Sequence, residues 1–197
     1  QFRAHLVTKH YVALLYGQLQ RPQGRIDAPI RRDRTHRLKM VVSGQDDSAR
    51  STTTAGPETR TVGGQRDALS LYAVRKSWTE VSLVDVEIKT GRTHQIRVHC
   101  AHIGHPVVAD EMYGRGRAAQ IRDRSIREGI AELGRQFLHA ARLSFVHPIT
   151  THRLTFDAPL PSDLLTLLAR LGPNDLSSKE SFATRPSRDD HDFSLRS

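Results

Sequence analysis

The sequence is poor in cysteine and in aromatic residues. It has one cysteine, Cys100, and one tryptophan in 197 residues, and Phe, Trp and Tyr together make up 6%. A single cysteine excludes an intramolecular disulfide framework and fits a reducing compartment. No run of about 18 apolar residues occurs, and no basic-then-apolar leader opens the chain. We therefore expect neither a membrane span nor a secretory signal peptide.

Negative charge is also scarce. The chain has 21 Asp and Glu against 30 Lys and Arg, which gives a net charge of +9 and an isoelectric point near 10.4. An isoelectric point above about 9 is typical of proteins that bind nucleic acid, although net charge says nothing about the fold. The length suits one domain with one sizeable core.

A strand, a tight turn and a short helix are predicted in succession between residues 81 and 106. Apolar residues alternate over residues 81–88, which predicts a strand. Gly91 permits a sharp turn, and Thr93 is the expected N-cap of the helix. The helix has apolar residues at spacings i, i+4 and i+7, namely Ile96, Cys100 and Ile103.

Basic residues crowd the other side of this helix. They are Arg92, His94, Arg97 and His99. A helix N-terminus already favours anions, so this place suits a phosphate or a carboxylate. On charge alone, a solvated basic face without a role fits this cluster equally well. A second basic cluster, Arg31, Arg32, Arg34, Arg37 and Lys39, is by itself more typical of a solvated loop. Beside the family resemblance described below, we interpret it as a phosphate-contacting surface.

The central stretch carries a specific motif. Residues 90–99 read Thr-Gly-Arg-Thr-His-Gln-Ile-Arg-Val-His, and four further segments agree in order: residues 9–14, 37–40, 110–114 and 138–143. Together they resemble the RluA-type pseudouridine synthases, which isomerise uridine in ribosomal or transfer RNA. The likeness covers roughly residues 1–171. At the position of Ala109 the family commonly has glycine.

The resemblance implies a fold and a mechanism. The fold would be α+β, with a mixed, largely antiparallel sheet and flanking helices, like an N-terminally truncated synthase catalytic domain. In the family an aspartate attacks the nucleoside, the uracil is detached, rotated and rejoined through carbon 5, and no cofactor or metal takes part. That aspartate lies in an Arg-Leu-Asp segment before the strand that contains Tyr11. No such segment occurs in these 197 residues, so we expect them to be inactive by themselves.

The resemblance also assigns roles to residues of this chain. Arg97 matches the arginine that pairs with the catalytic aspartate, and Tyr11 matches the tyrosine that stacks on the target base. Ile96 and Leu138 match apolar residues that hold the flipped base. RNA contacts are expected from Lys9, Lys39, Arg92 and His94. The competing interpretations are a surface ion pair for Arg97 and ordinary core packing for Tyr11, Ile96 and Leu138.

The remaining predictions concern organisation and location. Residues 1–171 are expected to form the synthase domain, interrupted by a flexible insertion at about 44–67, and residues 172–197 a disordered tail. We expect a monomer in the cytoplasm, or in an organelle if a transit peptide precedes Gln1. Further strands are expected over 9–15, 26–30, 40–42, 68–74, 137–146 and 153–156, with helices around 121–133 and 162–171.

Two other functions compete with an RNA pseudouridine synthase. The first is an RNA-binding protein that has the same scaffold without catalysis. The second is a metal site made from His94, His99, His102 and His105. His99 and His102 could share a helix face, but no Cys pair or Glu stands at a recognised ligand spacing. We therefore predict no metal.

Overall fold

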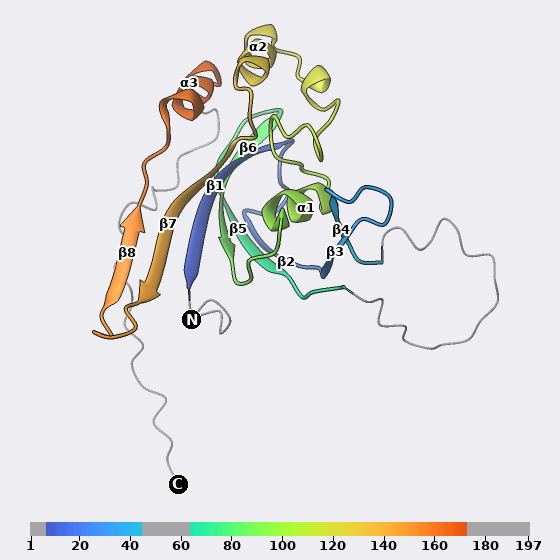
Figure 1. Ribbon diagram of the computed structural model, residues 1–197. Coiled ribbons are helices and arrows are strands. Elements are labelled where there is room, and N and C mark those ends of the chain that lie inside the picture. The colour runs from blue at the N-terminus through green and yellow to red at the C-terminus, as the bar shows by residue number, and fades with distance from the viewer. Residues whose placement is uncertain (1–6, 45–63, 173–197) are drawn as a thin grey trace, which may run out of the picture.

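The computed structural model describes residues 7–44 and 64–172, and its centre is a six-stranded sheet (Figure 1). The strand order is β2-β5-β6-β1-β7-β8, and each neighbouring pair is antiparallel. The strands are β1 (Thr8–Tyr16), β2 (Gln23–Asp27), β5 (Leu69–Ser77), β6 (Val81–Ile88), β7 (Leu138–Val146) and β8 (Arg153–Asp157). β3 (Ile30–Arg32) and β4 (Met40–Val42) form a separate hairpin. With three α-helices, this arrangement confirms the predicted α+β class.

Alternation along β1 divides the core into two sides. Ala13 and Leu15 pack with Val84 of β6 on one face of the sheet, whereas Val12 and Leu14 belong to the cluster on the other face. Successive side chains of a strand point to opposite faces, so a strand that is apolar at every position is buried on both. Full burial of a side chain such as Leu14 stabilises the fold by about 1.5–3 kcal/mol.

Helix α1 (Gln95–His102) lies between the sheet and the β3–β4 hairpin (Figure 1). Its Ile96 and Cys100 pack on the sheet face that carries Ala13. Val98 and, after the helix, Ile103 pack instead with the apolar residues of the hairpin. The predicted apolar stripe is thus shared between two neighbours, because the short helix is covered on both sides.

The opposite face of the sheet is covered by α2 (Arg124–Glu132) and α3 (Ser162–Arg170). A short 3-10 helix, η2 (Ala118–Gln120), precedes α2. Asp123 is the N-cap of α2, since its Oδ1 accepts a hydrogen bond from the Ile126 N–H at 3.1 Å. Ile130 and Leu164 pack with Val12 and so close this side of the core.

Strand β2 begins earlier than the sequence predicts. Residues 21–24 have turn composition, but Gln23 and Gly24 already pair with β5. Gly24 lies opposite Tyr72, and a Cβ at position 24 would come within 2.6 Å of the Tyr72 ring. Glycine therefore serves here to admit an aromatic ring, not to make a turn.

Most of the predicted insertion, and the tail beyond residue 172, lie outside the described residues. At the far end of the insertion, Arg66 forms an isolated β-bridge with Ile30 through hydrogen bonds of 2.9 and 3.0 Å. Arg66, at the end of the expected insertion, is therefore hydrogen-bonded to β3. Within residues 7–44 and 64–172, no helix is long and apolar enough to cross a membrane.

Candidate active site

The turn before α1 is held by one glutamine side chain. Oε1 of Gln95 accepts hydrogen bonds from the Thr90 hydroxyl at 2.7 Å and from the Arg92 N–H at 3.0 Å. The N-cap is His94, which has φ 56° and no side-chain capping bond, so the assignment to Thr93 was wrong. A left-handed backbone costs a non-glycine residue about 1 kcal/mol or more. Other contacts of His94 must therefore favour this conformation.

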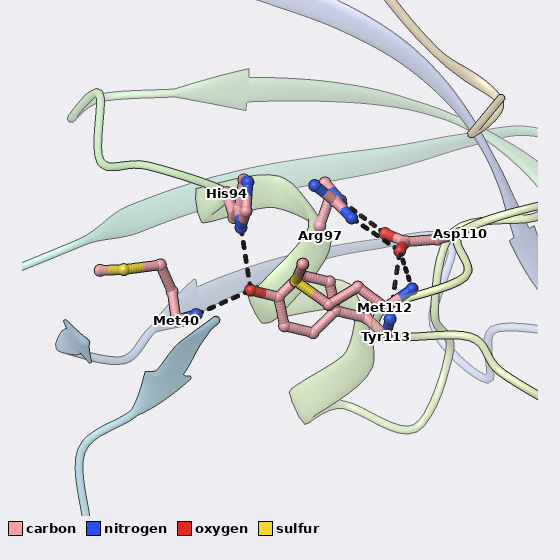
Figure 2. Close-up of polar contacts among 6 residues, drawn as sticks. All are labelled: Met40, His94, Arg97, Asp110, Met112 and Tyr113. Atoms are coloured by element: carbon pink, nitrogen blue, oxygen red, sulfur yellow. Dashed lines mark hydrogen bonds and ion pairs between the residues drawn. The ribbon is translucent and has the colours of Figure 1, made fainter. Parts of the chain in front are cut away.

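The Arg97 side chain is fixed by Asp110 (Figure 2). Its Nε donates to Oδ2 at 2.6 Å and its Nη2 to Oδ1 at 2.8 Å. The Asp110 side chain is fully buried and that of Arg97 is 14% exposed. Within the described part of the chain, Arg97 makes hydrogen bonds only along this lateral edge. The Nη1–Nη2 edge of the guanidinium therefore has donors for a second carboxylate.

Asp110 does more than pair with Arg97. Its Oδ1 also accepts hydrogen bonds from the Met112 and Tyr113 N–H groups at 3.0 and 3.1 Å. The hydrogen bond that Arg97 donates to Asp110 raises the pKa of Arg97, so the guanidinium stays charged across the physiological range. The preceding residue, Ala109, has φ 58°, a left-handed conformation that glycine adopts more readily than alanine.

Tyr113 connects α1 to the β3–β4 hairpin (Figure 2). Its hydroxyl accepts a hydrogen bond from the Met40 N–H at 2.9 Å and lies 3.1 Å from Nδ1 of His94. The Arg97 guanidinium carbon is 4.9 Å from the centre of the Tyr113 ring, and Nζ of Lys39 is 5.9 Å from it. One aromatic ring thus gathers two cations and a histidine from two segments, the start of α1 and the β3–β4 hairpin.

The same contacts define the charge state of His94. Burial, and next the charge of Arg97, lower the pKa of His94, so its imidazole is neutral at physiological pH. The arrangement that satisfies every group has the Tyr113 hydroxyl donating to Nδ1, with the remaining ring proton on Nε2. His94 then presents a neutral N–H donor. The contact with Tyr113 is the side-chain hydrogen bond found at this left-handed position.

The predicted base-binding residues lie together. Tyr11 on β1, Leu138 on β7 and Ile96 on α1 belong to one apolar cluster between the sheet and α1. Tyr11 is paired with Ala140 of β7 across the sheet, and burial raises the pKa of the Tyr11 phenol. A neutral phenol can stack and donate a hydrogen bond, but it is a poor base near neutral pH.

The other predicted RNA-contacting residues border the turn before α1. A Cβ added to Gly91 would lie 3.8 Å from Nζ of Lys9, and burial lowers the pKa of Lys9. Nε of Arg92 donates to the Asp67 carbonyl at 3.1 Å. Lys9 and Arg92 thus lie beside the turn, while Lys39 and His94 meet at Tyr113.

His99 does not belong to the basic face, and its inclusion there was wrong. It is fully buried, with Nδ1 2.9 Å from the Ser70 hydroxyl and Nε2 2.9 Å from the Ala28 carbonyl. Burial lowers its pKa, and both ring nitrogens are hydrogen-bonded to partners inside the core. Among the described residues, no group of three His, Cys, Asp or Glu side chains is placed to hold a metal ion. Arg31 is likewise buried at 5% exposure, unlike Arg32, Arg34 and Arg37 of the second basic cluster.

Two cavities lie elsewhere. One of about 530 Å³ is lined by Tyr16, Asp110 and Gly114, among others. Another, of about 900 Å³, lies on the sheet face opposite α1 and is lined by residues that include His10 and Leu165. Neither Tyr11 nor Arg97 lines either cavity, so the predicted base site coincides with neither.

Sequence reasoning missed the roles of Asp110 and Tyr113. Both lie in the segment 110–114 that contributed to the resemblance, yet neither was selected as a site residue. The available signal was the Asp-x-x-Tyr spacing, because an aspartate often accepts N–H groups two and three residues further on. The ion pair between Asp110 and Arg97 follows only from the fold.

The known proteins that this chain resembles are RNA pseudouridine synthases. A sequence model described as RNA pseudouridylate synthase matches residues 1–102. The chain is 36% identical to a ribosomal large subunit pseudouridine synthase D of Nitrosomonas europaea over 85% of the chain and 42% of the relative. It is 34% identical to a chloroplastic RNA pseudouridine synthase 2 of Arabidopsis thaliana over 87% of the chain and 40% of the relative. The chain thus spans less than half the length of these relatives.

A solved structure agrees with the fold. The human RNA pseudouridylate synthase domain containing 4 aligns with a TM-score of 0.65 and 26% identity, over 86% of this chain and 64% of that one. The matched residues 1–102 include the whole motif at 90–99. The chain belongs to the RNA pseudouridylate synthase family, within its RluA type.

Proposed function

We propose that this chain supplies the uridine-binding and arginine-bearing part of an enzyme that isomerises uridine to pseudouridine in ribosomal or transfer RNA. The observation that carries the proposal is the fixed guanidinium of Arg97. Asp110 holds it by one edge, and the adjacent residue Ile96 packs in the same cluster as Tyr11 and Leu138. The charged group and one residue of the apolar base site are therefore consecutive positions of α1.

In this proposal the nucleophile is an aspartate supplied by residues outside these 197. The second edge of Arg97 binds its carboxylate, keeps it ionised and aims it at the sugar of the target uridine. The glycosidic bond breaks, the uracil rotates, and it rejoins through carbon 5, which loses its proton while N1 gains one. Tyr11 acts as a neutral stacking partner and hydrogen-bond donor, because burial raises its pKa.

RNA is held by the cations around the turn before α1. Lys9, Lys39 and Arg92 border that turn or the Tyr113 ring, and His94 offers a directional N–H. The net charge of +9 adds a general attraction to phosphate. Extraction of a uridine from a stack requires an apolar pocket beside such charges.

The test is uridine conversion by the complete gene product. If it contains an Arg-Leu-Asp segment, we expect the protein to produce pseudouridine and its Asp→Ala variant to produce none, while the 197-residue chain alone binds RNA without converting it. The competing function is a non-catalytic RNA-binding protein on the same scaffold, and the residues encoded before Gln1 distinguish the two. A complete protein that lacks that segment and binds RNA without converting uridine would establish this alternative.

Arg97→Lys in the complete protein should lower the rate of uridine conversion by roughly 100-fold or more. Lysine keeps the charge but has no planar pair of edges, so it cannot hold Asp110 and a second carboxylate through two parallel hydrogen bonds each. Single-turnover kinetics would measure the loss. Arg124→Lys on α2 is the control, because Arg124 is 84% exposed and paired only along its own helix. Equal rates in the two variants would contradict the role of Arg97.

A further inference from the structure

The tip of the β3–β4 hairpin carries an exposed leucine. Leu38 is 79% exposed. It follows Arg37, which is exposed, and precedes Lys39, which is half-buried. Single exposed apolar side chains are common on protein surfaces, so exposure alone implies nothing. The hydrogen bonds within the loop and the position of the loop near Arg97 make the exposure of Leu38 informative.

The loop that presents Leu38 is braced from within. Oδ1 of Asp33 accepts hydrogen bonds from the Thr35 N–H, the Thr35 hydroxyl and the His36 N–H at 2.8, 2.9 and 3.1 Å. The Lys39 N–H donates to the His36 carbonyl at 2.8 Å, and the Asp33 N–H donates to the Lys39 carbonyl at 2.9 Å. The N–H of Thr35 contributes most to lowering the pKa of Asp33 to about 2, so the brace persists at physiological pH.

The loop is also anchored to the candidate active site. Met40, two residues after Leu38, donates its N–H to the Tyr113 hydroxyl at 2.9 Å. The same ring lies 4.9 Å from the Arg97 guanidinium carbon. Two residues of extended chain span about 7 Å. The leucine is therefore held close to the edge of the Arg97 site.

We propose that Leu38 is a wedge that enters the RNA base stack beside the target uridine. The inference rests on the proposed function, since it assumes that a uridine leaves its stack to reach α1. Extrusion of a base loses stacking with both neighbours, and an apolar side chain inserted between base steps replaces part of that contact. Arg34 and Arg37 are exposed on the same loop and can bind the phosphates on either side. A preorganised loop makes the insertion without a further loss of loop entropy.

The experiment uses the complete protein and a short RNA hairpin with a fluorescent adenine analogue next to a uridine in its stem. Binding of the native protein should raise the fluorescence, because the analogue loses its stacking. Leu38→Ala should bind the hairpin roughly tenfold more weakly and remove most of the fluorescence rise, while its affinity for single-stranded RNA stays unchanged. Leu38→Phe should retain both properties of the native protein.

Ile149→Ala is the matched control. Ile149 is 85% exposed in the turn between β7 and β8, and the change should leave hairpin binding and fluorescence unchanged. A native protein that binds no RNA at low salt would overturn both the proposed function and the wedge. Salt-sensitive RNA binding with no effect of Leu38→Ala on the fluorescence would overturn the wedge alone. Equal weakening for hairpin and single-stranded RNA would also overturn it, because Leu38 would then be a general contact.

Discussion

Asp110→Ala is expected to lower the free energy of unfolding by about 3–5 kcal/mol, the usual result of breaking a buried ion pair from one side. The variant leaves the Arg97 guanidinium, whose side chain is 14% exposed, without its carboxylate. It also removes the acceptor of the Met112 and Tyr113 N–H groups, which hold the turn that carries the Tyr113 ring. Urea denaturation at neutral pH would measure the difference.

An exposed ion pair of the same geometry provides the control. Nε and Nη2 of Arg135 bind both carboxylate oxygens of Asp163 at 2.7 and 3.0 Å, but the two side chains are 40% and 42% exposed. Solvent screens such pairs, so Arg135→Ala should change the denaturation midpoint little. Similar losses in the two variants would show that the Arg97–Asp110 pair does not gain its importance from burial.

His99→Ala should destabilise the protein by about 3 kcal/mol at pH 8, since it creates a cavity and leaves buried polar groups without partners. The Ala28 carbonyl can only accept, so Nε2 of His99 carries the proton. Nδ1 then accepts from the Ser70 hydroxyl, whose oxygen accepts from the Gln95 amide at 3.2 Å. His99→Ala removes the acceptor of the Ser70 hydroxyl and the donor to the Ala28 carbonyl. Denaturation of the variant against the native protein would measure the loss.

The same residue gives a pH dependence with a definite sign. Burial lowers the pKa of His99 in the folded state below the value of about 6.5 expected when unfolded, so the unfolded chain binds the proton more readily. Its stabilising effect is complete above that unfolded value and declines as the pH falls below it. The difference between native protein and His99→Ala should therefore shrink between pH 7 and pH 5. Nearby Asp27 opposes the shift and His102 reinforces it.

His102→Ala is the comparison for both measurements. His102 lies on the same helix but is exposed, so its removal should cost little stability at any pH. A difference for His99→Ala that stays constant from pH 7 to pH 5, or that grows, would contradict a buried neutral imidazole.

Much of the fold could be predicted because antiparallel strands with distinct faces alternate in polarity. The alternation over residues 81–88 predicted β6, and its residues Val84, Val86 and Ile88 share one cluster in the structure. The start of β2 could not be predicted in this way. Gly24 looks like a turn residue in the sequence, and only the Tyr72 ring opposite it explains glycine within a strand.

The site was predictable where residue type and local spacing decide it, and not where burial or distant partners do. Ile96 and Arg97 follow from the motif on α1. His99 was placed with the cations because a sequence shows that a residue can carry charge, whereas burial keeps this one neutral. The Arg97 partner is thirteen residues away, and Tyr113 reaches Met40 across 73 positions. Such pairings depend on how the hairpin docks on α1.

The place of β1 in the sheet has a consequence for biosynthesis. It is the first described strand to leave the ribosome, yet its two neighbours are β6 and β7, and β7 ends at residue 146. Both edges of β1 must therefore wait for much later parts of the polypeptide, and pairings this distant in sequence are slow to form. Until then the apolar segment from Val12 to Leu15 remains exposed, so it can bind chaperones or aggregate. We expect the nascent chain to become resistant to protease only after β7 has emerged.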